Sequence, residues 1–242
     1  MRVNVELDGY SIVCDFDCQQ LPTEKTIINT INAYSWVVSD SDSLFRSALT
    51  DSDILLPDGI SVVYAAKILK GVKVRKVAGI DLHKQLLELL DKEEGRCFYL
   101  GSSDSVLNSI KGKVAEEYPN VEVGFFSPPF KLSFSEEDNE QMCSIINDFR
   151  PDVLFVGMTA PKQEKWIHNN KINIQSSVIC GIGAVFDFYS GNKNRPPRWM
   201  VNLGMEWLGR LLSEPTRLWK RYTVYNVLFI KKILKLRLKS QS

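Results

Sequence analysis

Apolar residues along the chain follow two alternating patterns. Short runs rich in β-branched residues predict strands at 26–31, 53–56, 97–100, 121–126, 153–156 and 178–182. Between them, stretches with apolar residues three or four positions apart, such as 60–69 and 77–90, predict helices. Buried strands separated by helices are typical of a parallel sheet that is covered on both faces. The predicted fold class is therefore α/β, with a Rossmann-like, mostly parallel sheet.

The two ends of the chain depart from this alternation. Residues 2–18 alternate apolar and polar positions around Asp8-Gly9, which predicts a small hairpin. From Pro196 onward the strand patterns stop, and aromatic and basic residues interleave. We therefore expect one α/β domain over residues 1–195 and a helical appendage over residues 196–242.

The charge is distributed unevenly along the 242 residues. The formal net charge is +1, but all 29 acidic residues lie in 1–214 beside 22 basic ones, which gives that part −7. Residues 215–242 contain eight basic residues and no acidic one. A basic tail on an acidic body predicts an anionic partner, either a membrane surface or a nucleic acid.

Cysteine usage and hydropathy indicate a cytoplasmic protein. The five cysteines are scattered and form no C-x-x-C motif, which favours reduced thiols over a disulfide framework. The N-terminal segment has no apolar signal region. No run of 18 apolar residues occurs, so no membrane-spanning helix is expected.

Asp58 stands in a Pro-Asp-Gly turn directly after the predicted strand at 53–56. Aspartate is common in turns for conformational reasons alone, which is one explanation. The functional alternative is a general base, because a carboxylate at the end of a strand can take a proton from an attacking hydroxyl.

Pro161 occupies a position where a first helical residue would stand, so Gln163 and Glu164 fall in the first turn of a helix. That turn lies at the open end of the predicted sheet, where α/β proteins bind phosphorylated ligands. An amide at position 163 can hydrogen-bond sugar hydroxyls or a phosphate.

Three glycines stand at the ends of predicted strands. Gly181 is near the end of the strand at 178–182, Gly183 directly follows it, and Gly101 follows the strand at 97–100. Such glycines allow a uridine or a diphosphate to approach the backbone, and Asp187 would then suit ribose hydroxyls. A dinucleotide-dependent oxidoreductase is an alternative, although Phe186 takes the place of the third glycine of that fingerprint.

Metal-binding patterns are weak in this sequence. Three Asp-x-Asp triplets occur, at 15–17, 40–42 and 51–53, and none follows a long buried strand. The chain has only two histidines, so a histidine-based metal cluster is not expected. We expect a site without metal or cofactor, which must stabilise an anionic leaving group with cations and helix dipoles.

Several long segments carry a family resemblance: PDGISVV, VAGIDL, APKQEKWI, GIGAVFDFYSG, RPPRWM and GMEWLGRLLSEPTRLWKRY. They resemble the signature segments of the WecG/TagA/CpsF family, glycosyltransferase family 26, and extend over roughly residues 26–222. The resemblance implies a bacterial enzyme that moves a sugar from a UDP-sugar onto a polyprenyl-diphosphate-linked sugar, with inversion. It points to UDP-N-acetylmannosamine or a relative as donor, an undecaprenyl-linked acceptor, and a role in cell-surface polysaccharide or teichoic acid synthesis.

The resemblance also implies roles for individual residues. Asp58 would be the base, Gln163 would point into the site and Glu164 could hold a ribose hydroxyl. Thr30 and Asn32 match a T-x-N segment and would contact the donor or acceptor sugar. The chain has Ala-Tyr-Ser after Asn32, where the family more often has an acidic residue.

The same resemblance implies a set of cations around the diphosphate. Family members usually carry arginine at the position of Lys76, and Arg75 is adjacent, so both are candidates. Lysine offers a point charge but no bidentate fork. Further candidates come from the C-terminal segment, where three cations are spaced to share one helical face that closes over the site: Arg210, Arg217 and Lys220, with Arg221 beside them.

The last predicted helix has the pattern of a membrane-surface helix. On a helical wheel, four lysines at 231, 232, 235 and 239 fall within a sector of roughly 100°, and apolar residues occupy the rest. We expect peripheral attachment to the inner face of the cell membrane. A helix packed on the main domain or on a partner subunit is an alternative. The resemblance suggests self-association, and apolar content favours lipid over nucleic acid as the partner of the tail.

Overall fold

The structure, a computed structural model, describes residues 3–239. These residues form an eight-stranded sheet in the order β1-β2-β4-β3-β8-β7-β5-β6, in which only β1 and β2 pair antiparallel. The prediction of a mostly parallel sheet is therefore confirmed. The strands are β1 (Asn4–Leu7), β2 (Tyr10–Val13), β3 (Thr26–Ile31), β4 (Ile54–Pro57), β5 (Arg96–Gly101), β6 (Glu122–Phe126), β7 (Val153–Gly157) and β8 (Val178–Gly181).

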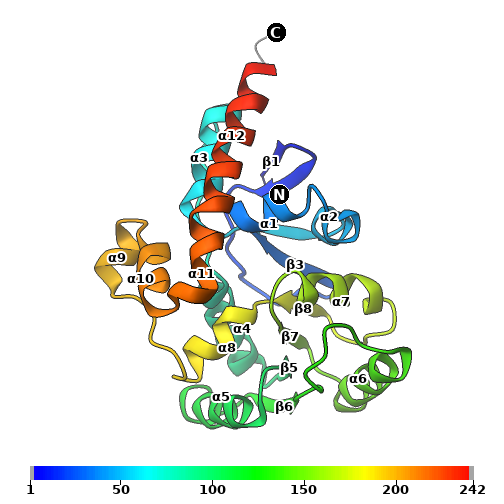
Figure 1. The fold of residues 1–242 in the computed structure, drawn as a ribbon. Coiled ribbons are helices and arrows are strands. Elements are labelled where there is room, and N and C mark those ends of the chain that lie inside the picture. Colours follow the sequence, from blue (N-terminus) through cyan, green and yellow to red (C-terminus); the bar gives the residue numbers. More distant parts are fainter. Residues whose placement is uncertain (1–2, 240–242) are drawn as a thin grey trace.

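Helices cover both faces of this sheet (Figure 1). One core cluster joins the sheet to α4, α5 and α8, and a second joins the opposite face to α6 and α7. A third cluster joins the β1–β2 hairpin to α1, α2, α3 and α12. The helices are α1 (Ala33–Val38), α2 (Ser43–Thr50), α3 (Ile60–Lys70), α4 (Gly79–Glu93), α5 (Asp104–Glu117), α6 (Glu136–Phe149), α7 (Lys162–Asn170), α8 (Gly183–Tyr189), α9 (Arg198–Asn202), α10 (Glu206–Ser213), α11 (Pro215–Tyr222) and α12 (Val224–Lys239).

Local sequence patterns account for most element boundaries. The hairpin turns at Asp8 and Gly9, both with positive φ, as the Asp-Gly pair predicts. The six predicted parallel strands are present within one or two residues of their expected ends. Pro161 is the N-cap of α7 instead of its first residue, which corrects the expectation by one position.

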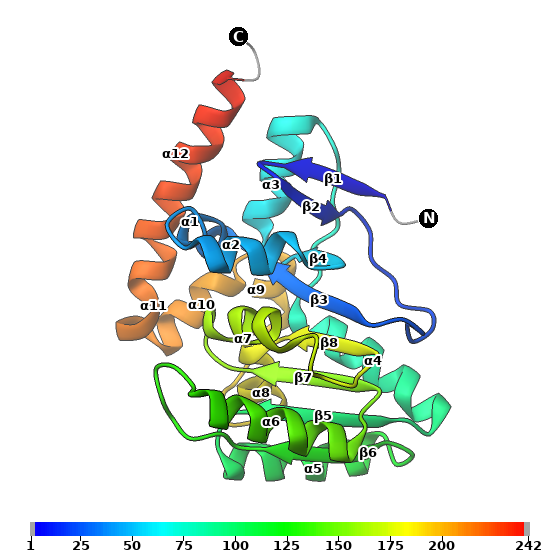
Figure 2. The same ribbon diagram turned by 90° about the vertical axis from the view of Figure 1, so that its right-hand side faces the viewer.

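The C-terminal segment is helical, but α12 is not simply appended to the domain. Phe229 and Ile233 of α12 are buried in the same cluster as Trp36 of α1. Figure 2 shows α12 beside α1 and α3, with α10 and α11 on the side towards which β3 and β7 point. Among residues 3–239, no helix has both the length and the apolar content needed to cross a membrane.

The carboxyl edge of the sheet is closely packed around Gly101, the last residue of β5. Its φ is +121°, and a Cβ atom there would lie 2.3 Å from the carbonyl oxygen of Gly157 on the neighbouring β7. A backbone oxygen cannot move away as the end of a flexible side chain can. Strand packing therefore explains this glycine without a ligand.

We predict that Gly101→Ala lowers the free energy of unfolding by about 1–3 kcal/mol, because the added methyl group clashes with backbone. Gly112→Ala is the matched control: its Cβ would meet nothing within 4 Å, and it lies inside α5. That control should raise stability by about 0.5–1 kcal/mol through helix propensity. Urea denaturation measures both, and equal stabilities for the two variants would contradict the packing explanation.

Candidate active site

A pocket of about 150 Å³ lies at the carboxyl edge of the sheet. Its walls come from three parts of the chain: the start of α1 after β3, the turn between β4 and α3 with Lys76, and the helices α10 to α12. The α/β domain and the C-terminal helices therefore build it together. Its lining includes Asn32, Tyr34, Asp58, Lys76, Glu206, Trp207, Arg210, Arg221, Tyr222 and Asn226.

Asp58 stands at this edge because it directly follows β4. Its backbone N–H donates to the carbonyl of Ile31, 2.9 Å away, and Val77 N–H donates to the carbonyl of Pro57 at 3.0 Å. These bonds fix the turn against the neighbouring strand. Burial raises the pKa of the Asp58 carboxyl, an effect that nearby cations oppose and Glu206 reinforces. A carboxylate with a raised pKa is a stronger base than an exposed one.

Three cations converge on the same pocket. Lys76 Nζ lies 2.7 Å from Glu206 Oε2, Arg210 lies over the ring of Phe188 and Arg221 lies over the ring of Tyr34. The distances from the guanidinium carbons to the ring centroids are 5.3 Å and 4.4 Å respectively. All three oppose the rise in the pKa of Asp58 that burial causes, and all three line the pocket beside it. Such a site can hold a doubly charged anion beside a carboxylate base.

Glu206 balances part of this positive charge. Burial alone would raise the pKa of its carboxyl, but the hydrogen bond from Lys76 and the charges of Lys76, Arg195 and Arg210 hold that pKa below its usual value. Glu206 therefore stays ionised in the pocket. Sequence reasoning did not identify it, although its spacing of four residues from Arg210 on α10 was a usable signal.

Arg75 and Lys76 point to different surroundings. Arg75 is more than half exposed, pairs with Asp15 at 2.7 Å and donates to the carbonyl of Phe16. Lys76 lines the pocket. Of the two adjacent cations that the sequence left open, the structure thus brings Lys76 to Asp58.

Gln163 and Glu164 are buried and are not among the residues that line the pocket. Gln163 Nε2 donates to Glu164 Oε1 at 2.9 Å, and Gln163 Oε1 accepts from Gly183 N–H at 3.0 Å. Glu164 Oε2 receives no hydrogen bond from any described residue. The amide of Gln163 therefore links α7 to the start of α8 in this structure, and Glu164 keeps an unused acceptor.

The glycines after β8 have packing roles of their own. A Cβ atom on Gly183 would lie 2.2 Å from the carbonyl oxygen of Met158, and one on Gly181 would lie 2.8 Å from Asn29 Oδ1. Asp187, further along α8, forms an ion pair with Lys193 at 2.8 Å. Each of the three residues expected to contact the nucleotide therefore contacts neighbouring parts of the protein in this structure.

The two residues of the T-x-N segment lie in different places, one in the pocket and one in the sheet. Asn32 lines the pocket and caps α1, where its Oδ1 accepts from Ser35 N–H at 3.1 Å. Thr30 lies within β3, opposite Leu56 of β4, and outside the pocket lining. Tyr34, which sequence reasoning missed, provides the ring beneath Arg221.

The prediction that Arg210, Arg217 and Lys220 share one helical face is wrong. α10 ends at Ser213 and α11 begins at Pro215, so the three residues belong to two helices. Arg217 pairs with Glu214 at 2.6 Å, and the exposed Lys220 lies near the Trp219 ring. Glu214 has a non-helical backbone conformation between the two helices, and Pro215 begins the second one. Of the four candidate cations, Arg210 and Arg221 line the pocket.

The Asp-x-Asp triplets have contacts within the fold. Asp15 pairs with Arg75, Asp42 caps α2 and pairs with Lys165, and Asp53 accepts from Ile27 N–H at 2.7 Å. Within residues 3–239, no three His, Cys, Asp or Glu side chains gather closely enough to hold a metal ion.

Comparison with known proteins agrees with this geometry. Residues 11–242 match the family described as the glycosyl transferase WecG/TagA/CpsF family. The chain belongs to this family. A relative from Bacillus subtilis (strain 168) is 33% identical over 195 residues, which cover 81% of this chain and 74% of that protein. A relative from Staphylococcus aureus (strain MW2) is 27% identical over 199 residues, covering 82% and 75% respectively.

Both relatives are named N-acetylglucosaminyldiphosphoundecaprenol N-acetyl-beta-D-mannosaminyltransferase. Membership of the WecG/TagA/CpsF family makes this chain a glycosyltransferase and agrees with the resemblance noted in the sequence. The oxidoreductase and the nucleic-acid binder were the alternatives. Close packing explains the glycines that prompted the first of them.

The buried Glu164 predicts a pH dependence of stability in this transferase. Burial raises the pKa of its carboxyl to about 7, against the opposing effect of its hydrogen bonds and of Arg221. The unfolded chain releases that proton near its ordinary pKa, so the native state holds one more proton between pH 4.5 and 7. Stability should therefore fall as pH rises through this window, by on the order of 3 kcal/mol.

Glu164→Gln mimics the protonated carboxyl and should remove this dependence. The measurement is urea denaturation of both proteins at pH 5 and pH 8, with the difference between them as the readout. Other titrating groups contribute equally to both proteins and cancel. A difference that does not change with pH would show that Glu164 ionises with an ordinary pKa.

Proposed function

We propose that this glycosyltransferase moves N-acetylmannosamine from a UDP-sugar onto N-acetylglucosaminyl-diphospho-undecaprenol, with inversion at the anomeric carbon. The names of its relatives support the choice of substrates. The single observation that carries the mechanism is the meeting of Asp58 with Lys76, Arg210 and Arg221 in one pocket.

Asp58 acts as the general base. Its carboxylate takes the proton from the attacking hydroxyl of the acceptor sugar as that oxygen bonds to the anomeric carbon. The bond from the anomeric carbon to the donor phosphate breaks, and UDP leaves with the electron pair. A single displacement of this kind inverts the anomeric centre.

Lys76, Arg210 and Arg221 stabilise the diphosphate on which negative charge develops. Positive groups fixed in a partly buried pocket act more strongly than in water, and they need no reorganisation during the reaction. Arg210 and Arg221 supply forked donors that suit phosphate oxygens, while Lys76 supplies a point charge. Asn32 and Tyr34, at the start of α1, are placed to contact a sugar ring in the same pocket.

We predict that Asp58→Asn lowers turnover by about 10²–10⁴-fold, the usual contribution of a general base, while UDP binding is retained. Asparagine keeps the size and the turn chemistry of aspartate but cannot take up the proton. Turnover is measured by mass spectrometry of a lipid-linked acceptor that is offered a panel of UDP-sugars, and UDP affinity is measured by calorimetry. Turnover within threefold of the wild type would exclude Asp58 as the base, and transfer of another sugar by the wild type would refute the donor.

We also propose that the outer side of α12 attaches the enzyme to the inner face of the bacterial membrane. Val227, Ile230 and Leu234 follow one side of this helix and are each at least half exposed. Lys231 and Lys235 are exposed on the flank of this side. Apolar side chains with neighbouring lysines are typical of a helix that lies in a membrane interface and contacts anionic headgroups. Self-association stays a prediction.

Of the four lysines expected to face the membrane, Lys232 does not. It turns towards the domain and pairs with Asp8 at 2.7 Å. The helix therefore has one side packed on the domain and another side that is available to lipid.

The double variant Ile230→Ser with Leu234→Ser should weaken partitioning onto vesicles that contain anionic lipid by about tenfold or more, since two apolar side chains no longer enter the interface. Vesicle sedimentation measures the effect. The control is Ile172→Ser, which removes a side chain that is 84% exposed and lies just beyond α7. Equal partitioning of the double variant and the control would refute α12 as the attachment surface.

A further inference from the structure

The end of α11 and the first half of α12 pack against α1. Arg221 lies over the ring of Tyr34, and Tyr225 packs edge-on against the same ring at 4.9 Å between centroids. One turn further on, Phe229 packs edge-on against Trp36 at 5.4 Å. The three residues of α11 and α12 are four positions apart, so a single stripe follows the helices from the pocket into the core.

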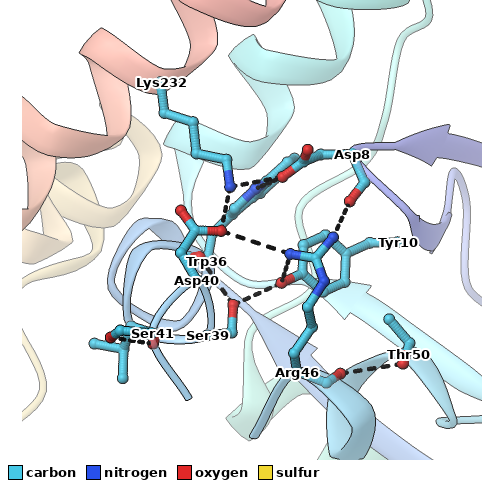
Figure 3. Close-up of polar contacts among 10 residues, drawn as sticks. Asp8, Tyr10, Trp36, Ser39, Asp40, Ser41, Arg46, Thr50 and Lys232 are labelled. Carbon is cyan, nitrogen blue, oxygen red and sulfur yellow. Dashed lines mark hydrogen bonds and ion pairs between the residues drawn. The ribbon is translucent and has the colours of Figure 1, made fainter. Parts of the chain in front are cut away.

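The stripe ends at Lys232, whose amino group lies between two carboxylates (Figure 3). Lys232 Nζ is 2.7 Å from Asp8 Oδ2 in the β1–β2 turn, and it also donates to Asp40 Oδ1 just after α1. Trp36 Nε1–H donates to the same Asp8 oxygen at 3.0 Å. One carboxylate thus joins the hairpin, α1 and α12.

Arg46 also holds Asp8 and Asp40 in place. Arg46 Nη2 donates to the backbone carbonyl of Asp8 at 2.6 Å, and Arg46 Nη1 lies 3.5 Å from Asp40 Oδ1. Tyr10 accepts from Arg46 at 3.2 Å, as Figure 3 shows. The side chains of Lys232 and Asp8 are each only 19% exposed, so water screens their ion pair weakly.

Hydrophobicity alone does not specify how α12 packs. Apolar residues surround the helix, with Phe229 and Ile233 buried and Val227, Ile230 and Leu234 exposed. Apolar contact is non-directional, so a rotated or shifted helix could bury a similar surface. Suppose that a partly buried charge finds its partners in just one arrangement of the helix. All other arrangements would leave it unpaired and are therefore excluded. Fixing a register is the best attested use of such buried pairs.

We propose that Lys232, with Asp8 and Asp40, is a latch that fixes the rotation and register of α12 and thereby positions Arg221 in the pocket. The three are positioning residues, because they contact one another and not the substrate. The inference rests on the proposed function of Arg221 at the diphosphate. The N-terminal hairpin thereby helps to shape the pocket, although none of its described residues lines it.

The test is a double-mutant cycle with calorimetric UDP binding and with kcat/KM on a short-chain, soluble acceptor as readouts. Lys232→Ala should lower UDP affinity and kcat/KM by about tenfold, and Arg221→Ala by at least as much. In the Arg221→Ala background, Lys232→Ala should cost less than threefold, because the cation that it positions is absent and only Tyr222 and Asn226 of the pocket lining still depend on these helices. Two independent, additive losses would overturn the proposal.

Two further variants separate positioning from general loss of stability or charge. Lys232→Arg keeps the charge and should restore at least half of the lost kcat/KM. Lys67→Ala removes one exposed cation from α3, beside α12, and should stay within twofold of the wild type.

If Lys232→Ala does not fold, Asp40→Asn removes one carboxylate from a 40%-exposed position and should give a smaller loss of UDP affinity. Wild-type affinity in that variant would overturn the latch.

Hydrogen exchange distinguishes failure of the latch from failure of the proposed function. The backbone amides of 215–233 should exchange faster in Lys232→Ala than in the wild type, whereas those of β3, β7 and β8 should not change. If Arg221→Ala alone leaves kcat/KM unchanged, the proposed role of Arg221 is wrong, and so is the link from the latch to the pocket. Unchanged exchange in α11 and α12 would overturn the latch itself.

Discussion

The packing of α12 against α1 is the contact on which the pocket depends. The parallel sheet brings Asp58 and Asn32 to its carboxyl edge, but Arg210 and Arg221 come from residues beyond the last strand. Those arginines reach the edge because the helices that follow the sheet turn back over it, and α12 buries Phe229 and Ile233 beside Trp36. The two ends of the chain therefore meet in one hydrophobic cluster, and the site is complete only when they do.

The packing of α12 against α1 also determines how charge is balanced in the pocket. A carboxylate that loses water becomes harder to ionise, and burial does raise the pKa of Asp58. The cations around it oppose this effect and favour the ionised form of the carboxyl. Glu206, itself held ionised by Lys76, reduces the repulsion among the cations while no diphosphate is bound. Three cations against two carboxylates still leave a pocket that attracts a doubly charged anion.

Local patterns in the sequence predicted the strands, the hairpin and the turn that carries Asp58, because each depends on neighbouring residues. The choice between Arg75 and Lys76 could not be predicted in this way. The two residues are adjacent. Arg75 pairs with Asp15, whereas Lys76 pairs with Glu206, which is 130 positions away in the sequence. The break between α10 and α11 had a local signal in Pro215, which the spacing of the cations obscured. Roles at the substrate depend on a ligand and stay predictions.

The helical wheel of α12 had the same kind of ambiguity. It placed four lysines in one sector, but it could not show that acidic groups on the hairpin and after α1 would bind one of them. Of these four lysines, Lys232 alone pairs with two carboxylates of the described residues. Under the proposed latch, this pairing fixes which apolar residues of α12 are buried and which face outward. From Lys232 to Arg221 is eleven residues, or roughly 16 Å along a helix axis at the usual rise per residue. α11 and α12 join at Thr223, and Arg221 and Tyr225, on either side of this joint, both pack on the ring of Tyr34. These contacts with α1 couple the orientation of α12 to that of Arg221.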